Sequence, residues 1–104
     1  MSDNPTIHLS GGHRFDLGKV MITPGALDAL KTAQAAPFEL IQRHASGDWG
    51  DLSDDDKREN DISVKHGFLI FSIYNIKGGG KVWVITEADR SRTTMLLPAE
   101  YDDN

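Results

Sequence analysis

The chain has 104 residues, which is enough for one domain and leaves little room for a second. Hydrophobic residues make up 38% and charged residues 26% of the sequence, as in ordinary globular proteins. There is no cysteine, which excludes disulfides and thiolate metal sites. The net charge of −5 argues against binding to duplex nucleic acid, which normally requires a basic patch.

The negative charge is concentrated in one segment. Residues 47–61 contain seven acids and two bases, so this window alone carries −5 and the rest of the chain is neutral. Such a run commonly marks the start of a solvated helix, because carboxylates interact favourably with the positive end of the helix dipole. The alternative interpretation is a carboxylate-rich face that mimics a nucleic acid.

The N-terminal half is expected to form a strand and two short helices. Residues 1–12 are polar, with a proline and paired glycines, and we expect them to be flexible. Alternating apolar residues from Phe15 to Thr23 predict a strand, broken at Gly18. Thr23-Pro24 is typical of a helix start, since threonine caps the first turn and proline fits its first position. A second helix is expected from Pro37 to Gly47.

A third helix and three strands are expected in the C-terminal half. Ser53 followed by three aspartates predicts a surface helix that ends at Gly67. The aromatic and β-branched segment 68–76 predicts a strand, which a glycine-rich turn joins to a second strand at 81–87. A third strand is expected at 93–97, before a proline that stops it.

These elements predict an α+β fold, with an N-terminal strand and two or three short helices followed by a three-stranded antiparallel meander. We expect a single domain over residues 13–101 and a tail at 102–104. The N-terminus lacks the pattern of a secretory signal, and the longest apolar run, Phe68–Ile73, is too short to cross a bilayer. We therefore expect a cytoplasmic protein without membrane contacts. An edge strand of the sheet leaves a homo-oligomer open.

The first unusual combination of polar side chains is RHASGDWGD (43–51). His44 lies near a predicted helix end and is a candidate acid, base or ligand, because histidine titrates near neutral pH. In the structural alternative, His44 interacts with the helix dipole, Gly47 caps the helix and Trp49 packs in the core.

The second combination lies at residues 86–94, where a carboxylate, guanidinium groups and hydroxyls are crowded together. Arg90 could stabilise a developing negative charge, such as that on a phosphate. The structural alternative is a polar hairpin in which Asp89 pairs with Arg90 or Arg92. The triple glycine at 78–80 lacks the strand-to-helix context of a phosphate-binding loop and predicts a hairpin turn.

No cofactor or metal site is predicted. The acidic run that begins at Asp48 lacks the ligand order of an EF-hand loop. The four histidines show neither His-x-His nor His-Glu-x-x-His spacing; they are His8, His13, His44 and His66.

Several motifs follow one another in the order found in one family. They are VMITPGALDAL (20–30), RHASGDWGDL (43–52), Asp56, Asn60 and VWVITEADRSRTTMLLPAEY (82–101). In these motifs the chain resembles a family of small bacterial proteins, described as plasmid-related and encoded on plasmids or other mobile elements. The resemblance implies a genomic setting and no mechanism. A methyltransferase subunit is implausible, because 104 residues cannot hold a cofactor-binding Rossmann domain.

The first functional hypothesis is a non-enzymatic accessory or interaction protein of a mobile element, with an unknown protein partner. In this hypothesis the acidic segment contacts the partner, with a tryptophan as anchor. The residues assigned to binding are Asp48, Trp49, Asp51, Asp56, Asn60 and Asp89.

The second hypothesis is a small metal-independent ribonuclease or toxin-like enzyme. Its catalytic residues would be His44, Glu87, Arg90 and Thr93. His44 and Glu87 would act as base and acid, Arg90 or Arg92 would bind the phosphate, and Thr93 or Tyr74 would donate a hydrogen bond. The acidic balance of the chain opposes this hypothesis, because it would repel RNA.

Overall fold

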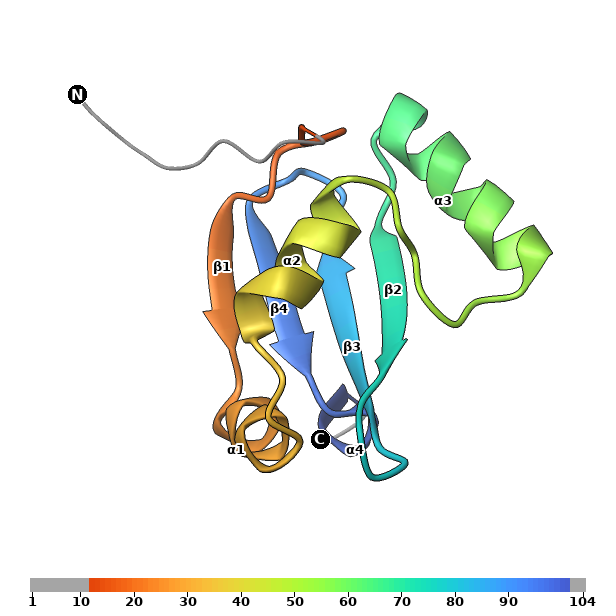
Figure 1. Ribbon diagram of the computed structural model, residues 1–104. Coiled ribbons are helices and arrows are strands. Elements are labelled where there is room, and N and C mark those ends of the chain that lie inside the picture. Colours follow the sequence, from red (N-terminus) through yellow and green to blue (C-terminus); the bar gives the residue numbers. More distant parts are fainter. Residues whose placement is uncertain (1–11, 102–104) are drawn as a thin grey trace.

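The computed structural model of the protein describes residues 12–101, so most of the predicted flexible N-terminus and the tail at 102–104 lie outside it. Figure 1 shows one sheet with helices on one side and at its ends. The strands are β1 (Lys19–Ile22), β2 (Ile70–Asn75), β3 (Lys81–Thr86) and β4 (Arg92–Leu96). The helices are α1 (Pro24–Thr32), α2 (Pro37–Ala45), α3 (Asp54–His66) and α4 (Pro98–Tyr101). Of these helices, none has the length and apolar character needed to cross a membrane.

The four strands form one mixed sheet in the order β1-β4-β3-β2. The antiparallel pairing of β2 with β3 and of β3 with β4 agrees with the predicted meander. However, β1 pairs with β4 in parallel, with Lys19 opposite Arg92 and Ile22 opposite Met95. The α+β class is confirmed, and the prediction of a three-stranded, purely antiparallel sheet was wrong. The paired residues of β1 and β4 are 73 positions apart, so their pairing depends on tertiary packing, which local sequence patterns do not specify.

The main core lies between the sheet and the helices that cover one of its faces. In Figure 1, α2 crosses in front of the sheet, and α1 lies below it. Leu30 of α1 and Ile41 of α2 pack with Val84 and Met95 of the central strands. A second cluster joins Phe15, Trp49 and Ile70, with Leu52 and Val64 packed against it. Burying a large apolar side chain contributes about 1.5–3 kcal/mol, so these contacts position the segments around the candidate site.

The predicted helix boundaries are confirmed at three positions. Thr23 Oγ1 accepts a hydrogen bond from the Ala26 amide at 3.1 Å, and Ser53 Oγ accepts one from the Asp56 amide at 3.1 Å. At the other end of α3, Gly67 adopts a left-handed conformation with φ of 77°. These contacts satisfy backbone groups that a helix end leaves unpaired.

The outer edge of β2 is covered by backbone and side-chain groups from outside the sheet. The Ile73 carbonyl accepts from the Asp51 amide at 2.7 Å, and the Ile73 amide donates to the Trp49 carbonyl at 3.3 Å. The Asn60 side chain pairs with Phe71 in the same way, donating to its carbonyl at 2.7 Å and accepting from its amide at 3.2 Å. The polar backbone groups on this edge are therefore satisfied, and the edge is closed to another strand.

This close approach requires a glycine between Trp49 and Asp51. Gly50 has a φ of 77° and forms a parallel bridge with Ile73. A Cβ atom at this position would overlap the Ile73 carbonyl oxygen. Gly67 has the same φ, but a Cβ atom there would meet nothing within 4 Å.

The two glycines make a matched pair for mutation. Gly67→Ala introduces only the left-handed backbone strain, about 1–2 kcal/mol. Gly50→Ala adds the overlap with β2, so we expect it to lower the free energy of unfolding by roughly 3 kcal/mol or more. Urea denaturation of both variants measures the difference, and equal losses would show that the bridge to β2 is not tightly packed.

Candidate functional site

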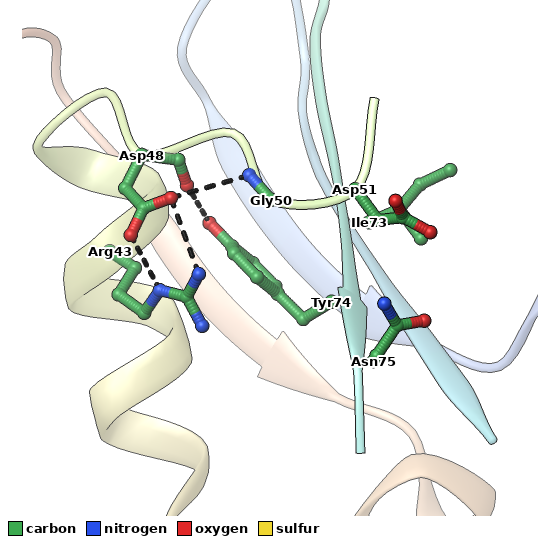
Figure 2. A pocket seen from close by; sticks show the side chains of 7 residues that line it. All are labelled: Arg43, Asp48, Gly50, Asp51, Ile73, Tyr74 and Asn75. Atoms are coloured by element: carbon green, nitrogen blue, oxygen red, sulfur yellow. Dashed lines mark hydrogen bonds and ion pairs between the residues drawn. The ribbon is translucent and has the colours of Figure 1, made fainter. Parts of the chain in front are cut away.

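An open pocket of about 300 Å3 lies between the end of α2, the loop that follows it and β2 (Figure 2). Its residues come from two segments that are distant in sequence. The lining residues are Arg43, Asp48, Gly50, Asp51, Ile73, Tyr74 and Asn75.

An arginine, an aspartate and a tyrosine form the inner wall of this pocket (Figure 2). The Arg43 guanidinium donates to both carboxylate oxygens of Asp48, from Nε at 2.7 Å and from Nη2 at 3.3 Å. It also lies over the Tyr74 ring, 4.6 Å from the centroid. The Tyr74 hydroxyl donates to the Asp48 carbonyl at 2.6 Å. These contacts fix the loop after α2 against the sheet.

The charged groups of the pocket are already paired within the protein. The hydrogen bond from Arg43 holds the pKa of Asp48 below its ordinary value. Similarly, Lys81 Nζ donates to Asp51 at 3.0 Å and lowers the pKa of that carboxyl. Burial raises the pKa of Tyr74, so its hydroxyl stays protonated near neutral pH. The pocket therefore has paired charges and no group that titrates near pH 7, which is not the arrangement of an acid–base catalyst.

His44 lies in the core, not on the surface. Its ring has no exposed area, and its two nitrogens contact hydroxyls of different strands. Nδ1 lies 2.6 Å from Ser72 Oγ of β2, and Nε2 lies 2.9 Å from Thr86 Oγ1 of β3. Thr86 Oγ1 lies 2.7 Å from Thr93 Oγ1 of β4, which donates to the Leu17 carbonyl at 2.7 Å. The candidate catalytic residues His44 and Thr93 thus belong to one buried hydrogen-bond chain.

The direction of every hydrogen bond in this chain follows from its last acceptor. The Leu17 carbonyl can only accept, so the single Thr93 hydroxyl proton is donated to it. Thr93 must then accept from Thr86, and Thr86 must accept from a proton on His44 Nε2. His44 Nδ1 is left without a proton and accepts from the Ser72 hydroxyl. This series of hydrogen bonds therefore selects the neutral Nε2–H tautomer of His44.

The surroundings of His44 also disfavour its charged form. The rings of Phe15 and Trp49 lie 5.3 Å and 5.9 Å from the imidazole, both edge-on. Burial lowers the pKa of His44 to about 3. Since the ring is neutral and out of reach of a substrate, the geometry does not support its proposed role as a catalytic acid or base.

Arg90 is also used inside the protein. Its Nη1 donates to the carbonyls of Phe68 at 2.8 Å and Glu87 at 3.0 Å, and its Nη2 donates to the Ser63 carbonyl at 2.8 Å. The residue itself has a left-handed φ of 61°. Arg90 therefore joins the end of α3 to the loops beside β2 and β3. The structural alternative had predicted that Asp89 pairs with an arginine. Instead, Asp89 accepts a hydrogen bond from the Ser91 amide at 3.0 Å.

Two of the residues predicted to bind a partner are buried. Trp49 is 4% exposed and donates from Nε1 to Asp61 at 3.2 Å, and Asn60 is 5% exposed and pairs with β2. Their assignment to a partner surface is therefore corrected to a structural role. Asp48 and Asp51 meet at the pocket, while Asp56 lies on α3 and Asp89 in the β3–β4 loop. Glu87 lines a separate recess with Tyr101, and its contact with Arg90 is made through the Glu87 backbone carbonyl.

The sequence-based interpretation missed the partners of these residues. The sequence did not predict that Ser72 and Thr86 would hydrogen-bond to His44, or that Arg43 would stack on Tyr74. The available signal was the serine inside the apolar run FLIFSIYNI, because a hydroxyl at a buried strand position requires a partner.

Between residues 12 and 101, no group of three or more histidine, aspartate or glutamate side chains is arranged to hold a metal ion. Comparison of the chain with protein-family models, with curated proteins and with solved structures gives no match. The resemblance to plasmid-related proteins consequently remains a prediction.

We expect the stability of the protein to fall in mild acid because of His44. Below its ordinary pKa of 6.5 the unfolded chain binds a proton that the folded chain does not, down to about pH 3. The free energy of unfolding should decrease by up to about 1.4 kcal/mol per pH unit in this range, with no contribution above pH 6.5. Urea denaturation between pH 6.5 and pH 5.0 measures the slope.

His44→Gln should remove this slope, whatever its own stability. His66→Gln, which changes an exposed histidine at the end of α3, should keep it. The same slope in the wild type and in His44→Gln would contradict the assignment. Nitrogen NMR shifts of the wild-type ring should also show the Nε2–H tautomer.

Proposed function

We propose that the protein is a non-enzymatic accessory protein that binds a basic surface of a partner protein through its acidic segment. The surface that we assign to binding, called here the acidic surface, lies on the loop after α2 and on the outer side of α3. Its residues are Asp48, Asp51, Asp54, Asp55, Asp56 and Glu59, all of which are exposed.

The observation that carries this proposal is the way the protein uses its polar residues. His44, Arg90 and Thr93, the strongest catalytic candidates, are held in internal hydrogen bonds. The carboxylates of the acidic surface point to solvent, and within residues 12–101 three of them form no ion pair. These three are Asp54, Asp56 and Glu59. Residues 47–61 also contain Lys57 and Arg58 but carry a net charge of −5, and an excess of exposed charge of one sign supports fast association with an oppositely charged partner.

The acidic surface is also held in a fixed position. Its loop is bound to β2 through the backbone at Ile73 and to Tyr74 through the Asp48 carbonyl. The helix is attached through the side chain of Asn60, which pairs with the β2 backbone. A preorganised surface loses little conformational entropy on binding, which favours recognition of a partner.

The resemblance to plasmid-related proteins implies a mobile-element setting and no mechanism, and such a setting agrees with an accessory role. No corresponding observation favours the ribonuclease hypothesis, because His44 is buried and does not line the recess that Glu87 lines.

Charge-neutralising variants test the proposal. The triple variant Asp54→Asn, Asp56→Asn, Glu59→Gln changes the net charge from −5 to −2 and removes the free carboxylates of α3. We expect it to lose a partner that the wild-type protein captures by crosslinking in its host cell. A partner of this kind should have a basic surface, and its capture by the wild type should weaken steeply as salt is raised.

A second triple variant provides the matched control. Asp16→Asn, Asp28→Asn, Glu39→Gln makes the same change in net charge at exposed positions outside the acidic surface. It should retain the partner. Equal loss of the partner in both variants, or capture that is insensitive to salt, would contradict the proposal.

A further inference from the structure

The two edges of the sheet differ in whether their outward-facing backbone groups are hydrogen-bonded. The outer edge of β2 is closed by Asn60 and by the chain around Gly50. The other edge is β1, which pairs only with β4. Within residues 12–101, no backbone or side-chain group hydrogen-bonds to the outer side of β1.

Pairing with β4 determines which backbone groups of β1 face outward. The amides of Lys19 and Thr23 donate to carbonyls of the β4 segment, Ser91 and Met95, each at 3.0 Å. Because successive residues of a strand direct their backbone groups to opposite sides, Val20 and Ile22 present their N–H and C=O groups away from the sheet. These groups form a hydrogen-bonding edge without a partner in the described chain.

We propose that β1 pairs with β1 of a second copy of the protein in antiparallel orientation, with the two-fold axis at Met21. Val20 of one copy then lies opposite Ile22 of the other, and each pair exchanges two hydrogen bonds. The two sheets join into one continuous sheet. An isologous contact of this kind is closed, since each copy offers the same edge to the other.

The sequence around β1 selects this register over its neighbours. Centring the pair on Ile22 would place Val20 opposite Pro24, which has no amide proton to donate. Centring it on Val20 would place Ile22 opposite Gly18, whose φ of 65° is not that of a strand. Only the register centred on Met21 uses both outward-facing residues of each copy.

The side chains of β1 agree with a contact between two copies. Val20 is 43% exposed on the helix-covered face of the sheet, and Met21 is 41% exposed on the opposite face. Both are apolar and would be covered by their neighbours across the two-fold axis. Lys19 would face Thr23 of the other copy, so the proposed register avoids placing two lysines opposite each other.

The contact is short, so it should form a weak and concentration-dependent dimer. A four-residue strand offers much less than the roughly 800 Å2 per partner that is typical of stable complexes. The experiment must therefore trap the dimer rather than rely on its survival during dilution.

Single cysteines can trap the dimer, because the protein contains none of its own. At the two-fold axis, Met21 and its copy form a non-hydrogen-bonded pair with Cα atoms about 4.5 Å apart, which suits a disulfide. We expect Met21→Cys to form covalent dimers under mild oxidation at least ~10-fold faster than Val20→Cys. The Cα atoms of two residues at position 20 would lie more than about 7 Å apart, because they are offset by two residues along the strands, and this is too far for a disulfide.

Ile62→Cys on α3 controls for random collision, since Ile62 is 47% exposed. Its helix is attached to β2, which is at the opposite edge of the sheet from β1. Circular dichroism verifies that each variant is folded. Equal crosslinking of the three variants, or none in Met21→Cys, would overturn the proposal.

A second measurement uses the wild-type protein. Amide hydrogen exchange at Val20 and Ile22 should slow as protein concentration rises, while exchange in the glycine turn at 78–79 stays constant. If Met21→Cys crosslinks but exchange at both amides is independent of concentration, the copies meet through sheet faces and the edge pairing is wrong.

Discussion

The neutral imidazole of His44 lies in the core and connects a helix to the strands of the sheet. His44 comes from α2, and its hydrogen-bond chain passes through β2, β3 and β4 to the carbonyl of Leu17, just before β1. Leaving a buried polar group unsatisfied costs about 1–3 kcal/mol, so each link constrains its neighbours. A shift of one residue in a strand would turn its hydroxyl to the other face and break the chain. This polar chain therefore selects the strand register, which apolar contacts alone specify less strictly.

The polar side chains that hold the fold together are used differently from those on the acidic surface. Arg90 and Asn60 satisfy backbone carbonyls and amides, as strands would. Arg43 is used in the stack on Tyr74 and in the pair with Asp48. At the start of α3, Asp55 pairs only with the exposed Arg58, and Asp54 and Asp56 form no ion pair within the described residues, so these carboxylates make the outer surface of the helix acidic.

Features encoded by neighbouring residues were predictable from the sequence. The caps at Thr23 and Ser53, the left-handed Gly67 and the β2–β3 hairpin all depend on short-range geometry. The parallel pairing of β1 with β4 was not predictable, because its partners lie far apart in the chain. The structural alternative for Trp49, packing in the core, is confirmed. For His44 neither interpretation described the hydroxyl partners, since they come from strands whose facing positions appear only in the assembled sheet.

The attachment of α3 has a consequence for the local dynamics of the protein. This helix is joined to the sheet by the amide of Asn60, by the guanidinium of Arg90 and by the bond from Trp49 to Asp61, rather than by a broad apolar face. Its release would expose little hydrocarbon, so this opening should depend only weakly on denaturant, unlike global unfolding. It would also uncover the part of the β2 edge at Phe71, which Asn60 covers. We therefore expect the helix to open as a separate cooperative unit that controls access to this part of a second strand edge.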